Sequence, residues 1–147
     1  MKNTRDVIKS VLTAQYYAVL CSADNGQAFG NLVAFAAAEN LKSIAFATAR
    51  RTSKYSRVKN NRQVSLLIDN RTNRDSDVLS AIAITAYGLA AELTRGAAAY
   101  KKLLARKHPH LSEFVGRPDT AIFRIKISAY AVAGFDRSEL VLTQHFA

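Results

Sequence analysis

The stretch YYAVLCSADNGQAFGNLVAFAAAENLKSIAFAT, residues 16–48, decides the fold class. It contains three runs rich in β-forming residues, at 16–22, 27–38 and 43–48. Asn25-Gly26, between the first two runs, favours a two-residue hairpin turn because both positions accept a positive φ. Glu39-Asn40 marks a second turn. The stretch therefore predicts three strands in an antiparallel meander.

The rest of the chain adds strands and a few helices. In residues 63–69, Val64, Leu66 and Ile68 alternate with other residues and predict a strand with one buried face. We expect further strands at 80–93, where Gly88 indicates a bulge, and at 121–135 and 139–146, joined around 136–138. We expect helices over 4–15, capped by Thr4, and from Thr94 to 107, with a polar loop at 70–77. The pattern predicts a mainly β fold, a six- to seven-stranded antiparallel split or closed barrel with flanking helices.

Length and composition favour a single domain spanning residues 1–147. The most apolar stretch, 81–91, is too short for the ~20 residues of a membrane span, and the N-terminus lacks the apolar core of a signal peptide. We therefore expect a soluble, cytoplasmic protein that does not enter membranes. Cys21 is the sole cysteine, which excludes an intramolecular disulfide and any multi-cysteine zinc site. Its apolar surroundings predict core packing.

The net charge of +10 predicts an anionic partner, which can be nucleic acid, an acidic membrane or a phosphorylated small molecule. Six bases and no acid fall within residues 50–62. There the strand ending at Thr48 leads to a helix start that Thr52 or Ser53 can cap. Hydroxyls, cations and helix N-terminal amides together suit a phosphate monoester. The alternative interpretation is a solvated basic turn.

The ordered series of these segments resembles the pyridoxamine 5'-phosphate oxidase-related family of FMN-binding split barrels. The likeness is best over residues 16–93, and the tail matches more loosely at 108–109, 118–119 and 133–135. The segments that carry it are the Gly26 turn, Asn31–Phe35, Ile44–Thr48, Thr52-Ser53-Lys54, Asn60-Asn61, Val64–Ile68 and the strand containing Gly88.

This resemblance implies a homodimer with two FMN sites at the subunit interface. It implies that the end of the third strand and the following helix hold the FMN phosphate, and that the second strand lines the flavin ring. The implied phosphate residues are Thr48, Arg50, Thr52, Ser53 and Lys54, with Arg51 as an addition, and the implied ring residues are Asn31, Val33 and Ala34.

The chain also departs from the family members that oxidise pyridoxamine phosphate. Those members carry a basic residue where this chain has Asn31, a lysine at Ala36 and a proline at Arg62, and they end with an arginine and histidine motif that is not evident here. The resemblance therefore implies a flavin-dependent oxidoreductase for an unidentified small substrate rather than a vitamin B6 oxidase. The flavin itself carries the hydride chemistry, so no residue is identified as catalytic.

Two other functions remain open. The first is a haem- or deazaflavin-binding split barrel, with His108, His110 and His145 as the available haem ligands. Lacking a supporting cysteine or carboxylate pattern, these histidines are interpreted as surface or loop residues, and we expect no metal site. The second is a basic nucleic-acid-binding module, which ranks below the flavin hypothesis because no aromatic and basic series forms a reading surface.

Overall fold

A computed structural model of the chain describes residues 3–147. Its regular elements follow the predicted order of a three-strand meander, a short helix and then further strands. The strands are β1 (Tyr17–Asp24), β2 (Gln27–Ala37), β3 (Ser43–Ala49), β4 (Gln63–Asp69), β5 (Ala83–Glu92), β6 (Thr120–Gly134) and β7 (Arg137–Leu142). The helices are α1 (Thr4–Ala14), α2 (Ser53–Asn60), α3 (Asp77–Ser80), α4 (Ala98–Lys107) and α5 (Ser112–Val115), with short 3-10 turns at Pro109–Leu111 and Thr143–His145.

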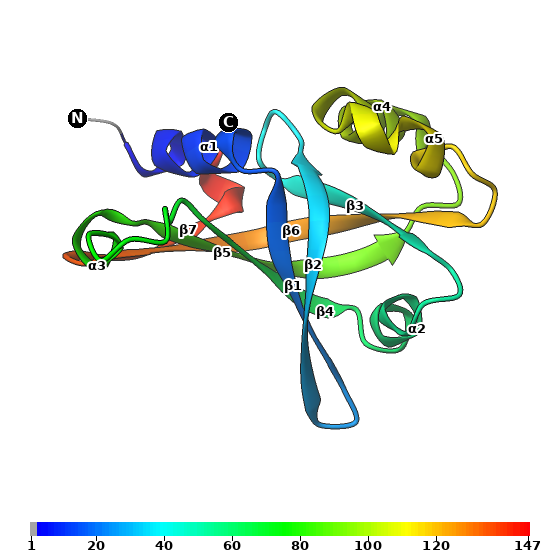
Figure 1. Cartoon of the computed structure of the whole chain (residues 1–147), viewed down its shortest axis with the longest axis horizontal. Helices are drawn as coiled ribbons and strands as arrows, with labels where there is room; N and C mark the ends of the chain where they lie inside the picture. Colours follow the sequence, from blue (N-terminus) through cyan, green and yellow to red (C-terminus); the bar gives the residue numbers. More distant parts are fainter. Residues whose placement is uncertain (1–2) are drawn as a thin grey trace.

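The sheet closes on itself into a barrel. Its strand order is β3-β2-β1-β4-β5-β6-β7, and an additional antiparallel pairing of β3 with β6 joins the ends of a six-stranded ring. The last strand, β7, lies outside the ring and pairs only with the far half of β6 (Figure 1). The predicted mainly β split barrel is therefore confirmed.

Two glycine-containing positions shape the sheet as predicted. Asn25 and Gly26 have φ values of 49° and 79°, so the turn between β1 and β2 is the two-residue type that requires a positive φ at both positions. This hairpin extends well beyond the barrel (Figure 1). At the other position the register between β5 and β6 shifts between Tyr87 and Gly88, which is the expected bulge. A Cβ on Gly88 would fall on the Lys126 carbonyl.

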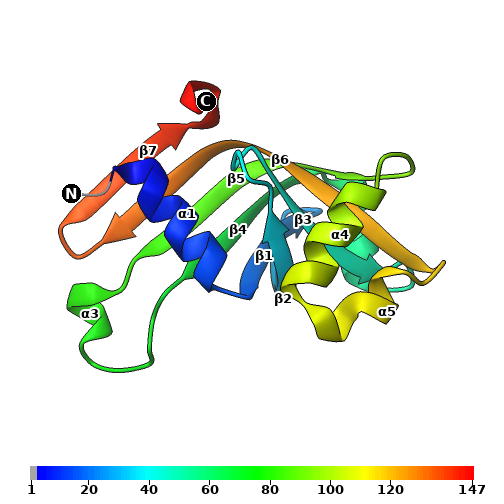
Figure 2. The same ribbon diagram turned by 90° about the horizontal axis from the view of Figure 1, so that it is seen from above.

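The barrel interior is apolar, and Phe46 and Phe123 stack in it with ring centroids 5.2 Å apart. Helix α1 contributes Ile8, Val11 and Leu12 to this core, and α2 contributes Val58. A second cluster lies outside the ring, where α4 and α5 cover β2, β3 and β6 (Figure 2). Helix α2 is thus held against the barrel by the packing of Val58 in the core.

Two of the expected helix caps, Thr4 and Thr94, differ from the structure. Asn3 caps α1, because its side chain accepts a hydrogen bond from the Asp6 amide, and Thr4 is the first helical residue. Thr94 does not cap a helix, since Gly96 turns the chain with a φ of 70° and α4 begins only at Ala98. A left-handed residue at Gly96 interrupts the helical conformation that a cap at Thr94 would require.

Two strand boundaries also differ. The fifth strand begins at Ala83 rather than at residue 80, because Ser80 ends α3. The last strand runs over 137–142 rather than 139–146. Its pairing ends where the Thr143 hydroxyl donates a 2.7 Å hydrogen bond to the Ile127 carbonyl and the chain enters a 3-10 turn. Among the described residues, none of the helices is long and apolar enough to cross a membrane.

Candidate functional site

The junction between β3 and α2 is built by two threonine hydroxyls. Thr52 caps α2 as predicted, because its Oγ1 accepts a hydrogen bond from the Tyr55 amide at 3.2 Å and donates one to the Ala49 carbonyl at 2.9 Å. The buried Thr48 Oγ1 lies 3.0 Å from Thr52 Oγ1. Since the Thr52 proton is already donated, Thr48 is the donor in this pair. The two hydroxyls therefore stabilise the turn between β3 and α2 through hydrogen bonds inside it.

The first turn of α2 offers donors to an anion. The amides of Ser53 and Lys54 have no acceptor within residues 3–147, because an α-helix leaves its first N–H groups unpaired. These amides lie at the positive end of the helix dipole. Ser53 is exposed and adds a hydroxyl, and Lys54 adds a half-buried ammonium. Burial and the charge of Arg57 lower the pKa of Lys54, and nothing in the described chain pairs with this side chain.

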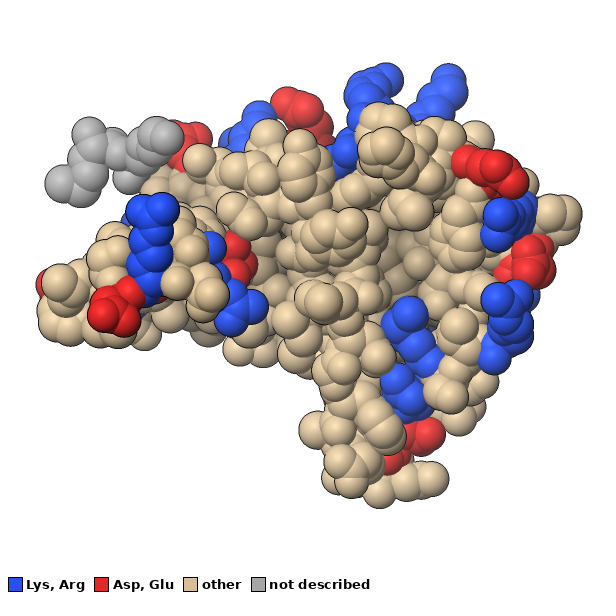
Figure 3. Space-filling view, in the orientation of Figure 1, with Lys and Arg blue, Asp and Glu red and all other residues tan. Residues whose placement is uncertain are grey.

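Arg57 stands one turn beyond Lys54 on α2 and reaches the second strand. Its Nη2 donates a 2.8 Å hydrogen bond to Asn31 Oδ1, and its guanidinium carbon lies 4.0 Å from the centroid of the Phe29 ring. Its Nε is buried and has no hydrogen-bond partner among residues 3–147. The fold thus brings Asn31, predicted as a ring residue, next to the helix predicted to hold the phosphate. Figure 3 shows basic side chains gathered over α2 beside the projecting hairpin.

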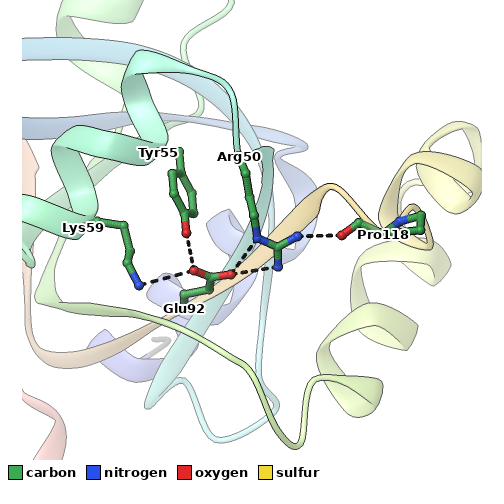
Figure 4. Close-up of polar contacts among 5 residues, drawn as sticks. All are labelled: Arg50, Tyr55, Lys59, Glu92 and Pro118. Atoms are coloured by element: carbon green, nitrogen blue, oxygen red, sulfur yellow. Dashed lines mark hydrogen bonds and ion pairs between the residues drawn. The ribbon is translucent and has the colours of Figure 1, made fainter.

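A buried carboxylate binds two other bases of this region, Arg50 and Lys59 (Figure 4). Only 6% of the Glu92 side chain is exposed, at the end of β5. It accepts hydrogen bonds from Arg50 at 2.8 and 3.0 Å, from the Tyr55 hydroxyl at 2.6 Å and from Lys59 at 3.4 Å. Burial raises the pKa of Glu92, but these hydrogen bonds more than offset it and lower the pKa overall.

Apart from Thr48 and Thr52, which hold the turn, the predicted phosphate residues divide into two groups. Arg50 is engaged by Glu92 and also donates a 2.6 Å hydrogen bond to the Pro118 carbonyl, which ties the turn between β3 and α2 to the segment before β6. Arg51 is 82% exposed and lies 3.8 Å from Asp119. Ser53 and Lys54, by contrast, keep free donors at the start of the helix.

The predicted ring residues lie on different sides of β2. Asn31 shares the inner face with Val33, and Val33 is 5% exposed and packs in the barrel core. Only the backbone of Val33 is therefore available to a ligand outside the barrel. Ala34 is half-buried on the outer face, paired with Tyr17 of β1.

An apolar, grooved surface covers the outside of β1, β4 and β5. One groove of about 810 Å³ lies over Gly88 and Leu89, and a second of about 540 Å³ lies beside Cys21. Tyr87 lines both. Leu32 is 73% exposed on the outer face of the neighbouring strand β2. Cys21, expected in the core, is only half-buried because β1 turns it outward while Leu20 and Ser22 face in.

The histidines do not come together. His108 lies in a loop as expected, but its ring is buried and its Nε2 is 2.8 Å from the Phe35 carbonyl. His110 and His145 are exposed. Within residues 3–147 no group of three or more histidine, cysteine, aspartate or glutamate side chains is arranged to hold a metal ion.

The sequence matches the profile of the family described as pyridoxamine 5'-phosphate oxidase over residues 4–132. The chain belongs to this family. No curated protein matches it. Solved structures of other proteins, among them the following three, share this fold at low sequence identity. A likeness at such identity supports the fold alone.

A haem-binding protein from Mycobacterium smegmatis is 11% identical with a TM-score of 0.84, covering 98% of this chain and 60% of its own. An FAD-binding protein from Mesorhizobium loti is 17% identical with a TM-score of 0.71, and the match covers 88% of this chain and 92% of the other. General Stress Protein 26 from Bacillus anthracis is 18% identical with a TM-score of 0.69, and the match covers 94% of this chain and 97% of the other. Two of these three proteins are named for a cofactor, haem in one and FAD in the other.

Sequence reasoning missed Glu92 and the role of Arg57. Glu92 is an acid near the end of an apolar strand in a basic chain, which is an available but weak signal. Arg57 was counted only as one of six bases. Its contact with Asn31 spans 26 positions, so no local pattern indicates it.

Proposed function

We propose that this chain binds FMN as a homodimer, with the cofactor at the subunit interface, and works as a flavin-dependent oxidoreductase on a small substrate. The observation that carries the proposal is the first turn of α2. There the amides of Ser53 and Lys54 have no acceptor, and the Lys54 ammonium forms no ion pair, within residues 3–147. Family membership supports the same placement of the phosphate.

The donor set fits a phosphate monoester. Hydroxyl, amide and ammonium donors at a helix N-terminus are the groups that bind phosphate oxygens. In this proposal Ser53 and Lys54 hold the phosphate, while Thr48 and Thr52 keep the turn in shape. Asn31 and the backbone of Val33 and Ala34 lie along the flavin ring. When bound, FMN supplies the hydride transfer. The chain positions it and shields it from water.

The absorbance spectrum of the purified protein tests the cofactor. FMN gives a yellow protein whose chromophore is released on denaturation and is identified by mass. FAD, deazaflavin or haem identified in its place would replace FMN in the proposal, since two relatives are named for binding FAD or haem. A colourless protein that does not bind added FMN at micromolar concentration would overturn it.

Lys54→Ala is expected to weaken FMN binding by about 1.5–3 kcal/mol, because it removes a charge-assisted hydrogen bond to the phosphate. Flavin fluorescence titration measures the change. Lys102→Ala is the matched control, since Lys102 is an exposed lysine on α4, away from this turn. An unchanged affinity in Lys54→Ala would remove Lys54 from the site.

The exposed apolar surface supports the dimer. Large apolar patches on monomers are uncommon, and Leu32, Tyr87 and Leu89 are all more than 40% exposed. Leu32→Asp is expected to shift the protein to half its mass in sedimentation velocity, because a carboxylate cannot be buried without a partner. Val78→Asp, at a similarly exposed position on α3, is expected to leave the mass unchanged. A wild-type chain that sediments at 16.1 kDa would contradict the dimer.

A further inference from the structure

Two neighbouring side chains hold the Arg57 guanidinium in place, yet not all of its hydrogen-bond donors have an acceptor in the described structure. Phe29 supports the face of its guanidinium and Asn31 accepts one of its N–H groups at 2.8 Å. A guanidinium carries five N–H donors. Its buried Nε has no acceptor in the described structure. A buried donor without an acceptor costs free energy, so a ligand that supplies an acceptor here would gain binding energy.

The charges around Arg57 point to an anion. Lys54 and Arg57 lie three positions apart, so they share one face of α2. The proximity of Arg57 contributes to the lowered pKa of Lys54, after burial. Neither side chain forms an ion pair within residues 3–147, whereas Arg50 and Lys59 of the same region share Glu92. Two neighbouring positive charges without an acid match a ligand with two negative charges.

We propose that Arg57 is a second anchor for the cofactor phosphate and that, with Lys54, it makes this site select a phosphate monoester. The inference rests on the proposed flavin function and goes further by naming the residue that sets the specificity. A phosphate monoester approaches two negative charges near neutral pH. Riboflavin carries no phosphate, and each phosphate of FAD carries one charge.

The contact between Arg57 and Asn31 gives this selection a geometric basis. Asn31 Oδ1 and the Phe29 ring fix the plane of the guanidinium before a ligand arrives. A fixed guanidinium plane can present two N–H groups to two phosphate oxygens. Lys54 acts as a point charge beside it. A phosphate monoester leaves three oxygens for these donors and the helix amides.

The test compares ligands rather than activity. Dissociation constants of FMN, FAD and riboflavin are measured by fluorescence for the wild type, Arg57→Gln, Arg57→Lys and the control Lys102→Gln. Arg57→Gln is expected to weaken FMN binding about 10- to 100-fold, the loss of one charge-assisted contact. Riboflavin binding is expected to stay within about twofold of the wild type, and FAD binding to change less than FMN binding.

The other variants separate charge from structure. Arg57→Lys keeps the positive charge and is expected to retain part of the preference for FMN over riboflavin, which also covers the case in which Arg57→Gln does not fold. Lys102→Gln removes an equal charge from an exposed position on α4, away from this turn, and is expected to leave the preference unchanged. If the wild type binds FMN but both Arg57 variants lower FMN and riboflavin affinity equally, or lower neither, only this inference is overturned. A wild type that binds no flavin overturns the proposed function and this inference together.

Discussion

Gly88→Ala is expected to destabilise the protein by about 3 kcal/mol or more, because the added Cβ has no space in the bulge. It would overlap the Lys126 carbonyl, lie 2.9 Å from the Lys126 carbonyl carbon and lie 2.8 Å from Ile125 Cγ2. Two of these three neighbours are backbone atoms of the paired strand β6, so relief requires the barrel wall to move. Urea denaturation followed by circular dichroism measures the loss.

Gly30→Ala is the matched control for this substitution. Gly30 also lies in a strand and has an ordinary negative φ, but a Cβ there meets only Val19 Cγ1 at 3.6 Å. We expect a change of at most ~0.5 kcal/mol, since alanine also restricts the unfolded chain. Equal effects of the two substitutions would show that the bulge at Gly88 does not depend on the close approach of the β6 backbone at Lys126.

Glu92→Ala is expected to lower the free energy of unfolding by about 2–4 kcal/mol, because it removes the shared acceptor of three side chains. Arg50, Tyr55 and Lys59 would then lose their common partner beneath α2. Arg50 and Lys59 are partly exposed and regain water, which keeps the loss below that of a fully buried pair. Thermal unfolding measures this loss as a fall in Tm, roughly 3 °C per kcal/mol for a chain of this length.

Glu113→Ala provides the control. Its carboxylate is 87% exposed and pairs with Arg117 at 3.4 Å, and such surface pairs contribute at most ~1 kcal/mol. Stability that falls as little in Glu92→Ala as in Glu113→Ala would contradict a structural role for the buried carboxylate.

The same group predicts a pH dependence with a definite sign. The pKa of Glu92 is lower in the folded protein than in a free glutamate, so the unfolded chain binds its proton first as the pH falls. Its contribution is therefore fully present above the ordinary glutamate pKa and is lost as the pH falls through the lowered folded value. Glu92→Gln is expected to flatten this part of the stability curve.

Local features of the sequence predicted local structure well. Asn25-Gly26 produced its hairpin turn and Gly88 its bulge, because each depends on the φ or the size of a single residue. Thr52 was correctly predicted as a helix cap. Thr94 was not, since a positive φ at Gly96 decides where α4 begins.

Contacts between distant residues were beyond local patterns. Glu92 is 42 positions from Arg50, and only the closed barrel brings them together. The division of the basic segment follows from this contact, because Glu92 neutralises Arg50 and Lys59, whereas Lys54 and Arg57 form no ion pair with any described residue. The sequence therefore predicted where the charge lies along the chain, but not which charges remain available to a ligand.

The pairing of β3 with β6 has a consequence for how the chain folds. It joins Ser43–Ala49 to Thr120–Lys126, so the ring cannot close until a strand some 75 positions downstream is in place. Contacts at such sequence separation slow folding, because a long loop must be ordered before they form. Until then the meander presents Ile44, Phe46 and a free β3 edge to solvent. During synthesis, this intermediate is the species most exposed to aggregation, and a chain that stops before residue 120 would remain in it.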